Sequence, residues 1–308
     1  MAQKILVATE KPFAAIAVDK ITAICSQGGF PCVLLESYTE KKELLTAVKD
    51  AEALIVRSDI VDAELINAAE KLQIVVRAGA GYDNIDLEAA GKRGIVVMNT
   101  PGQNANAVAE LAFSMMLYLA RKGFAGKSGT ELRGKTIGLH AYGNVGRYVA
   151  MIAQGFGMKA LAFDPFVKPE KIREDGVHAL DDIKELYRQS DYISLHLPKT
   201  KETTGSINKE LLSLLKPGAV LINTARAEIV DENSLLQVFA ENPGFMYGSD
   251  VAPGCREEIA NRFPGRFIFT AKKMGAQTEE ANINAAIASA NQIISFFKTG
   301  DRTFQVNR

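Results

Sequence analysis

The sequence predicts an α/β protein with two doubly wound parallel-sheet domains joined by two long helices. Short apolar runs alternate with amphipathic helical patterns along the chain, which is the order of elements that builds parallel sheets. The chain has 308 residues, enough for two domains that each bury a core. Two helical stretches are longer than the others, 104–122 after the first series of strands and 278–298 after the second, and we expect them to connect the domains.

The first series of strands is expected in apolar runs near 5–8, 32–35, 54–57, 74–78 and 96–99. Helices fill the intervals between them. The helix at 62–71 can begin at Asp62, because a carboxylate accepts the free N–H groups of a first turn. The long helix 104–122 can be capped by Asn104, and Gly123 is its stop signal.

The second series begins at Thr136, with six strands expected near 137–141, 160–164, 192–197, 220–224, 246–251 and 267–270. The long helix 278–298 has Glu279 and Glu280 in its first turn, where acidic side chains favour the helix dipole. Gly300 follows its end as a stop signal. The last residues then return to the first domain. We therefore expect one domain at 1–98 with 279–308, and the other at 99–278.

Charge and composition argue against several classes of function. Lys plus Arg number 36 and so do Asp plus Glu, with no basic stripe, so nucleic acid is not expected as a partner. No apolar run approaches the roughly 20 residues of a membrane span, and the N-terminus lacks the apolar region of a signal peptide. We therefore expect a cytoplasmic protein without membrane contact. The cysteines, Cys25, Cys32 and Cys255, have no metal-ligand spacing, so no metal is expected, and their odd number fits a reducing compartment.

Residues 136–164 form the most informative motif. An apolar strand, a tight glycine turn, an amphipathic helix, a second strand and an aspartate follow one another, as in the βαβ unit that binds a dinucleotide. The turn has the pattern A-x-G-x-x-G and comprises Ala141, Tyr142, Gly143, Asn144, Val145 and Gly146. Gly143 lets the backbone approach a pyrophosphate, and Gly146 lets the helix pack close to the strand. N–H groups near Asn144 and Val145 would face the phosphates.

Asp164 ends the second strand, 18 residues after Gly146. A carboxylate at this point accepts hydrogen bonds from the adenosine ribose and repels a 2′-phosphate, so NAD is expected rather than NADP. A glycine turn in some other α/β domain is the alternative. The turn, its context and the acid together favour the dinucleotide.

Several further motifs identify a family. In family order the chain carries RAGAGYDNID (77–86), NTPGQNANAVAEL (99–111), SLHLP (194–198), NTAR (223–226), SDV (249–251) and GAQTEEA (275–281). With the dinucleotide motif, they make the chain resemble the D-isomer-specific 2-hydroxyacid dehydrogenases over essentially its whole length. The resemblance implies a flavodoxin-like substrate domain, a Rossmann NAD domain and a homodimer or higher homo-oligomer formed through the cofactor domains.

Within the family the amino-acid sequence is most similar to those of the short phosphoglycerate dehydrogenases. Arg57 and Ser58 follow a strand where that subgroup grips the substrate phosphate, and Asn104 matches its asparagine position. The sequence of residues 129–136 also resembles that of the subgroup. Because the chain ends at Arg308, we expect no C-terminal regulatory domain and no allosteric inhibition by serine.

The substrate expected from this resemblance is a small anion with a carboxylate beside a C–OH or C=O group. Backbone N–H groups of Ala78, Gly79, Ala80 and Gly81 can hold the carboxylate; a plain strand-to-helix turn is the alternative. Arg226, at the end of a strand, can grip carboxylate and carbonyl oxygens with its planar fork; a surface ion pair is the alternative. Arg57 and Ser58 would hold the phosphate unless Arg57 is only a solvated side chain.

The resemblance also implies the cofactor contacts. Asp250 would orient the nicotinamide amide, with Val251 packed nearby. His196 lies in the cofactor-lining turn, where a structural role and a direct contact are both open. The remaining cofactor positions are Leu197, Pro198, Thr224, Ala225, Arg226 and Gly275. His140 is expected to be packed inside a strand, and His178 to lie at the surface.

The chain departs from the family at the acid–base position. The family has T-P-H-x-G there, whereas this chain has Ala-Lys-Lys-Met-Gly at 271–275, so Lys273 stands in the histidine position. No histidine follows His196. The partner glutamate is also displaced: its position, five residues after Asp250, is Cys255. The nearest acids are Glu257 and Glu258, which could reach the site only through a shifted loop.

The two changes fit together chemically. A carboxylate raises the pKa of a histidine into the working range, whereas a free lysine starts near 10.4 and needs no such partner. As an ammonium, Lys273 can donate a proton to a ketone; as a base it needs a lowered pKa, which burial, Arg226 or Lys272 would favour. Some short phosphoglycerate dehydrogenases also carry lysine here. A degenerate, inactive site is the alternative.

The resemblance predicts NAD-dependent oxidation of 3-phospho-D-glycerate to 3-phosphohydroxypyruvate, the first step of serine synthesis. Hydride would leave C2 for nicotinamide C4, with Arg226 on the carboxylate and hydroxyl, Lys273 taking the proton and Arg57 on the phosphate. One alternative is another substrate of the family, such as glyoxylate or hydroxypyruvate. Another is a non-catalytic NAD-sensing protein like the corepressors of the family, which the presence of Arg226 and Asp250 argues against.

Overall fold

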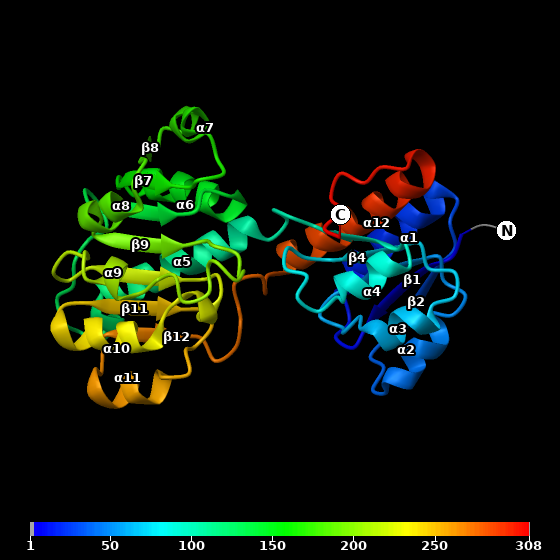
Figure 1. Ribbon diagram of the computed structural model, residues 1–308, viewed down its shortest axis with the longest axis horizontal. Helices are drawn as coiled ribbons and strands as arrows, with labels where there is room; N and C mark the ends of the chain where they lie inside the picture. Colours follow the sequence, from blue (N-terminus) through cyan, green and yellow to red (C-terminus); the bar gives the residue numbers. More distant parts are fainter. Residues whose placement is uncertain (1–2, 308) are drawn as a thin grey trace. The chain divides into compact units, whose positions relative to one another are not determined.

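The computed structural model describes residues 3–307 and divides into two compact units. Unit 1 comprises Met1–Asn104 and Thr278–Arg308, and unit 2 comprises Ala105–Gln277. In Figure 1 the blue and red ends of the chain share unit 1, while the green to orange middle forms unit 2. The expected boundaries were 98/99 and 278/279.

Unit 1 contains a five-stranded parallel sheet in the order β2-β1-β3-β4-β5, which is the flavodoxin-like order. Ile5 and Val7 of β1 pack with α1 and α12 on one face, and Leu6 packs with α2, α3 and α4 on the other, as the alternation of a strand requires. The strands are β1 (Ile5–Thr9), β2 (Cys32–Glu36), β3 (Ala53–Val56), β4 (Ile74–Arg77) and β5 (Val96–Asn99). The helices are α1 (Ala15–Gly28), α2 (Lys41–Ala47), α3 (Ala63–Ala68), α4 (Leu87–Lys92) and α12 (Glu279–Thr299).

Unit 2 contains a seven-stranded parallel sheet in the order β12-β11-β10-β9-β6-β7-β8, the Rossmann order with one strand added at the β12 edge. The strands are β6 (Thr136–His140), β7 (Lys159–Phe163), β8 (His178–Ala179), β9 (Tyr192–Leu195), β10 (Val220–Asn223), β11 (Met246–Ser249) and β12 (Phe267–Phe269). The helices are α5 (Ala105–Ala120), α6 (Asn144–Gly155), α7 (Pro169–Glu174), α8 (Ile183–Gln189), α9 (Lys209–Leu212), α10 (Glu232–Glu241) and α11 (Arg256–Arg262). The short 3₁₀ turns η1 (Lys122–Phe124) and η2 (Ala227–Ile229) complete the unit.

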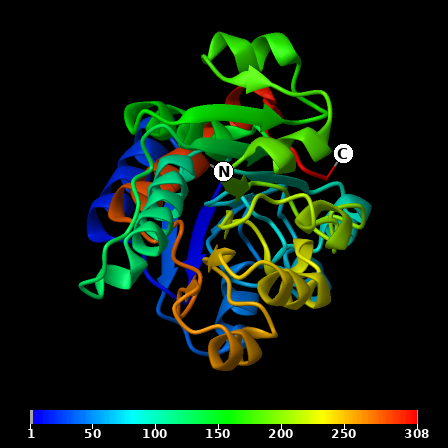
Figure 2. The ribbon, with the colours of Figure 1, turned by 90° about the vertical axis from the view of Figure 1, so that its left-hand side faces the viewer.

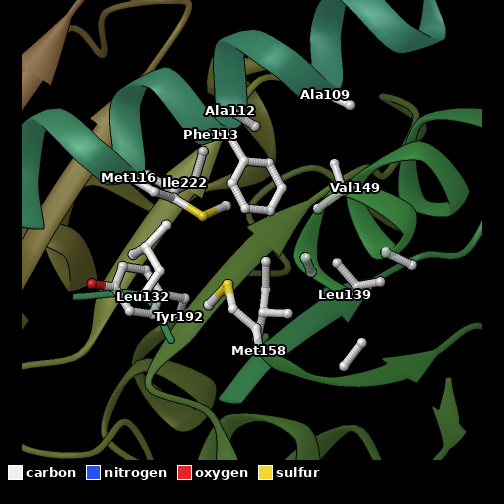
Figure 3. Packing of buried hydrophobic residues seen from close by; sticks show 14 of the residues in the cluster. Ala109, Ala112, Phe113, Met116, Leu132, Leu139, Val149, Met158, Tyr192 and Ile222 are labelled. Atoms are coloured by element: carbon white, nitrogen blue, oxygen red, sulfur yellow. The ribbon is translucent and has the colours of Figure 1, made fainter. Parts of the chain in front are cut away.

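Two apolar layers cover the sheet of unit 2. On one face α5 and α6 pack onto the strands, with Phe113 and Met116 of α5 beside Val149 of α6 and Leu139 of β6 (Figure 3). The other face carries α8 to α11, and Figure 2 shows the yellow α10 on the opposite side of the sheet from the teal α5. The predicted doubly wound α/β architecture is therefore confirmed.

The two long helices each belong to one unit. The chain changes unit directly before α5 and directly before α12, so each helix packs in the unit that follows the change. Thr278 caps α12 by accepting the N–H of Ala281 at 3.1 Å, and Gly300 ends it in the left-handed conformation (φ 72°). No helix in the described part of the chain is long and apolar enough to cross a membrane.

Several predicted boundaries were wrong in the same direction. The strands expected to reach Ala141, Asp164, Leu197, Thr224 and Val251 end one or two residues earlier. Ala141 shows a reason: its φ of 78° is left-handed and cannot continue a strand. The short edge strand β8 (His178–Ala179) was not predicted, because two residues cannot show an alternating pattern; the exposed His178 lies on it. The helix expected at 62–71 ends at Ala68.

Candidate active site

The glycine turn after β6 leads directly into α6. An added Cβ on Gly146 would lie 2.7 Å from the carbonyl oxygen of Ala141, so only glycine allows the helix to start this close to the strand. A Cβ on Gly143 would meet nothing within 4 Å, and Gly143 and Asn144 are exposed, so the space above the helix N-terminus is open. This arrangement fits a pyrophosphate lying on the N–H groups of the first turn.

Asp164 holds this turn in addition to standing at the expected ribose position. It follows β7, and its Oδ2 accepts the N–H of Tyr142 at 2.7 Å, while its Oδ1 accepts the N–H of Phe166 at 2.8 Å. The Tyr142 ring is buried, and its hydroxyl donates to Asp175 at 3.1 Å. Because each carboxylate oxygen has two lone pairs, both oxygens of Asp164 can still accept a ribose hydroxyl.

His196 lies beside the glycine turn, directly after β9. Its Cδ2 is 3.6 Å from the point where a Cβ of Gly146 would lie. Its Nε2 is covered and has no hydrogen-bond partner within residues 3–307. Burial and the neighbouring His140 lower the pKa of His196 to about 3, so the ring is neutral at physiological pH. His140, as expected, is packed in β6, with Nδ1 3.1 Å from the hydroxyl of Tyr187.

The loop after β10 is shaped by Asn223, which sequence reasoning did not single out. The buried Asn223 accepts the N–H of Ala225 at 3.0 Å and donates to the carbonyl of Arg226 at 2.8 Å. These bonds close the turn that presents Arg226, which is half-buried. The Oγ1 of Thr224 in the same turn is buried without a partner in the described chain.

Asp250 connects the end of β11 to the segment that carries Lys273. It is 0% exposed. Its Oδ1 accepts the N–H of Met274 at 2.6 Å, and its Oδ2 accepts the N–H of Gly275 at 2.7 Å. Lys273 lies directly before these residues and is exposed, and the half-buried Val251 follows Asp250.

The two candidate acids lie in the first turn of α11 and are exposed. Glu258 forms an i,i+4 ion pair with Arg262, which is typical of a solvated helix face. Cys255, at the family's glutamate position, is the N-cap residue of this helix. Burial, reinforced by Glu232, raises the pKa of its thiol to about 11, so it stays protonated at neutral pH.

In unit 1, Arg57 follows β3 and is held in place. Its guanidinium donates to the carbonyls of Pro12 at 2.9 Å and Lys11 at 3.1 Å, and to Oδ1 of Asn282 at 2.7 Å. It also lies 5.1 Å from the centre of the Phe13 ring. Burial lowers its pKa, although the nearby Asp59 opposes this. These acceptors are neutral, so they do not cancel its charge; Ser58, next in the chain, is exposed.

The glycine-rich loop after β4 brings a second arginine beside Arg57. Gly79 has φ +153°, and a Cβ there would lie 1.3 Å from Nη1 of Arg77, so the guanidinium rests on the glycine backbone. Nε of Arg77 donates to the carbonyl of Arg57 at 3.0 Å. No role was assigned to Arg77 from the sequence, although it lies in the motif at 77–86. Arg77 ends β4 and pairs in register with Val56, the residue before Arg57. An arginine at the end of the neighbouring strand was therefore the signal that could have indicated its role.

The rest of that loop is anchored by β5. Asn99 donates to the carbonyl of Ala80 at 2.6 Å, and the N–H of Thr100 donates to the carbonyl of Gly79 at 3.0 Å. Asn104 is half-buried directly before α5. The loop therefore has a fixed shape at the carboxyl ends of parallel strands, where α/β sheets bind ligands.

Comparison with known proteins agrees with this geometry. Residues 108–262 match the model of the D-isomer specific 2-hydroxyacid dehydrogenase, NAD binding domain. D-3-phosphoglycerate dehydrogenase of Homo sapiens is 38% identical over 303 residues, covering 92% of this chain and 56% of the human protein. The chain thus spans about half the length of that relative. Glyoxylate reductase of Thermococcus litoralis is 39% identical over 279 residues, covering 83% of each protein.

A solved structure extends the match to the whole chain. The crystal structure of NAD⁺-bound 3-phosphoglycerate dehydrogenase from Entamoeba histolytica has a TM-score of 0.90 and 48% identity, covering 100% of this chain and 99% of that one. The sheet orders, the nucleotide turn and these matches lead to one conclusion: the chain belongs to the D-isomer-specific 2-hydroxyacid dehydrogenase family.

Proposed function

We propose that the protein oxidises 3-phospho-D-glycerate to 3-phosphohydroxypyruvate with NAD. The observation that carries the substrate choice is Arg57, whose half-buried guanidinium is oriented by three neutral acceptors and has Arg77 beside it. Two arginines at adjacent strand ends suit a phosphate, because one guanidinium can donate two N–H groups to two phosphate oxygens. An unphosphorylated 2-hydroxy acid has no group that needs this site.

The residues of unit 2 fit NAD. The open space over Gly143 suits the pyrophosphate, and Asp164 has acceptor capacity for the ribose. The covered Nε2 of His196 and Oγ1 of Thr224 are polar atoms that the cofactor can satisfy. We assign the turn Tyr142–Gly146 and the strand-end residues Leu197, Pro198, Ala225 and Val251 to the same cofactor surface. When bound, NAD would accept the hydride at C4 of its nicotinamide.

The protein side of the reaction requires three tasks. The N–H groups of Ala78 and Gly79, expected to face the substrate, instead donate to the carbonyls of Val56 and Arg77, both at 2.8 Å. We therefore assign the carboxylate to the N–H groups of Ala80 and Gly81 and to Arg226, which also orients the C2 oxygen. As C2 loses its hydrogen with two electrons, the hydroxyl proton passes to Nζ of Lys273, which must be a neutral amine at that moment. In the reverse direction the ammonium returns this proton to the ketone. Glu257 or Glu258 could supply a partner acid only if the start of α11 moved.

A second substrate deserves a direct comparison, because the Thermococcus litoralis relative of similar identity is a glyoxylate reductase. Initial rates should be measured with NAD and 3-phospho-D-glycerate or D-glycerate, and with NADH and glyoxylate or hydroxypyruvate. We expect the highest kcat/KM with the phosphorylated pair. A higher kcat/KM for glyoxylate would replace the proposed substrate, and no turnover with any of them would favour a non-catalytic NAD-binding protein. A homodimer also remains a prediction, which sedimentation velocity can check.

A further inference from the structure

The segment that carries Lys273 is fastened to Asp250 on both sides. On the N-terminal side, Oγ1 of Thr270 donates to the carbonyl of Asp250 at 2.6 Å and lies 3.0 Å from its Oδ1. On the C-terminal side, the N–H groups of Met274 and Gly275 donate to the carboxylate at 2.6 and 2.7 Å. Only residues 271–273 lie between the two anchors, so the backbone of Lys273 has little freedom.

Gly275 makes this attachment possible. An added Cβ at that position would lie 2.9 Å from Oδ2 of Asp250 and 3.3 Å from Cγ2 of Val108. Asp250 is buried and Val108 is half-buried, so the segment can approach the carboxylate this closely only with glycine. Gly275 therefore serves the anchor rather than a turn that requires a positive φ.

Each carboxylate oxygen of Asp250 accepts one backbone N–H, Oδ1 that of Met274 and Oδ2 that of Gly275. The single hydroxyl proton of Thr270 goes to the Asp250 carbonyl, so its Oγ1 only lies close to Oδ1. Each carboxylate oxygen has two lone pairs, so Asp250 can hold both N–H groups and still accept a nicotinamide amide.

We propose that Asp250 is a positioning residue, which holds Lys273 in place for proton transfer through the backbone N–H groups of the two residues that follow it. The proposal rests on the proposed function in so far as Lys273 is the proton-transfer group. An exposed lysine has a long flexible side chain, so its Cα must be fixed if its amine is to reach one substrate oxygen reproducibly.

Asp250→Asn tests the anchor without changing the size of the side chain. Both oxygens of Asp250 accept a backbone N–H, and in asparagine one of them becomes an NH₂ group, so one of the two backbone N–H groups loses its acceptor. We expect amide hydrogen exchange in peptides covering 271–277 to rise. At saturating NAD and substrate, kcat should fall roughly 10²-fold, the cost of a small misplacement. Gly275→Ala should produce both effects while keeping the carboxylate. Asp231→Asn is the control, because Asp231 also accepts a backbone N–H, from Ser234 at 2.8 Å, but caps α10; neither readout should change.

The outcomes separate the possible roles. If Asp250→Asn raises the KM for NAD but leaves kcat and exchange unchanged, Asp250 serves the nicotinamide alone and the proposal is wrong. If exchange rises while kcat is unchanged, the anchor has no catalytic consequence and the proposal is again wrong. Lys273→Ala tests the proposed function independently: if it is fully active, Lys273 is not the proton-transfer group, whatever Asp250→Asn does to exchange.

Discussion

The backbone N–H of Tyr142 donates to Oδ2 of Asp164 across 2.7 Å, so the acid that should select the cofactor also holds the turn that should bind its phosphates. The same carboxylate accepts the N–H of Phe166 through Oδ1. One side chain thus fixes the backbone at two points around the expected adenosine site. A substitution at Asp164 must therefore affect both the shape of the turn and the choice of cofactor.

Asp164→Ala should lower kcat/KM for NAD by roughly 30-fold or more, because it leaves the Tyr142 N–H without its acceptor and removes the ribose contact, each worth about 1–3 kcal/mol. It should also narrow the preference for NAD over NADP, since the repulsion of a 2′-phosphate is lost. Initial rates with both cofactors measure this. Asp175→Ala removes the partners of the Tyr142 hydroxyl and of Arg147 but leaves the Tyr142 N–H bonded to Asp164, so it should keep the preference. A wild-type enzyme with equal kcat/KM for both cofactors would contradict the assignment.

Ala141→Gly should stabilise the protein by about 1 kcal/mol, because Ala141 has a left-handed φ of 78° that costs a Cβ-bearing residue about that much. For a unit of this size the thermal midpoint should rise by roughly 2–4 °C. Ala153→Gly, inside α6 with normal helical geometry, should instead lower it. Calorimetry of both variants checks the pair. A lower midpoint for Ala141→Gly would mean that the turn relaxes without strain.

Acid should destabilise the protein through the buried His140 and the half-buried His196, whose Nε2 is covered. Burial lowers the pKa of His140 to about 4, and that of His196 to about 3, whereas both take up a proton near pH 6.5 once unfolded. The unfolded chain therefore binds more protons below pH 6.5. The stabilisation is complete above that pH and is lost towards pH 4, at about 1.4 kcal/mol per pH unit for each histidine. The free energy of unfolding, measured with urea between pH 4.5 and 7.5, should change less steeply with pH in His140→Gln than in the wild type. An unchanged slope of this free energy against pH would show that other groups cause the acid destabilisation.

The sequence predicted the strands well because each is a short apolar run between helices, and local pattern suffices for that. It did not predict where the strands end, because Ala141 and Thr224 look like strand residues until the turn geometry is known. The main anchors of the candidate site join residues far apart in the chain, such as Asp250 with Gly275 and Arg57 with Asn282. Contacts of that kind depend on the packed fold, so residue type and spacing could suggest the participants but not the partners.

Arg57→Ala should reduce kcat/KM for 3-phospho-D-glycerate by roughly 10- to 10²-fold, since a charge-assisted hydrogen bond to phosphate contributes about 1.5–3 kcal/mol. The small activity expected with unphosphorylated D-glycerate should change little. Arg57→Lys should recover only part of the loss, because an ammonium lacks the paired donors of the fork. Arg93→Ala is the matched control, because Arg93 also donates to a main-chain carbonyl of unit 1, that of Ile66. Equal losses with both substrates would show that Arg57 supports the loop rather than the phosphate.

Lys273→Ala should lower kcat by roughly 10²–10⁴, the usual contribution of a positioned acid–base group. Lys273 lies two residues before Gly275, whose backbone Asp250 holds, so its Cα has a defined place even though its side chain is exposed. NAD affinity should change little, because the amine acts on the substrate oxygen. In the wild type, kcat/KM for alcohol oxidation should rise with pH through one ionisation that disappears in the variant.

Lys272→Ala is the matched control, since Lys272 is also exposed but exchanges no proton with the substrate in the proposed reaction, so it should lose much less activity than Lys273→Ala. If Lys272→Ala is inactive while Lys273→Ala turns over normally, the assignment is wrong by one residue. Lys273→His should keep partial activity at best, because the histidine would lack a carboxylate to raise its pKa. If neither lysine matters, the proton leaves to water or to Glu257 or Glu258, and α11 must then move, since Glu258 is paired with Arg262 on an exposed helix face.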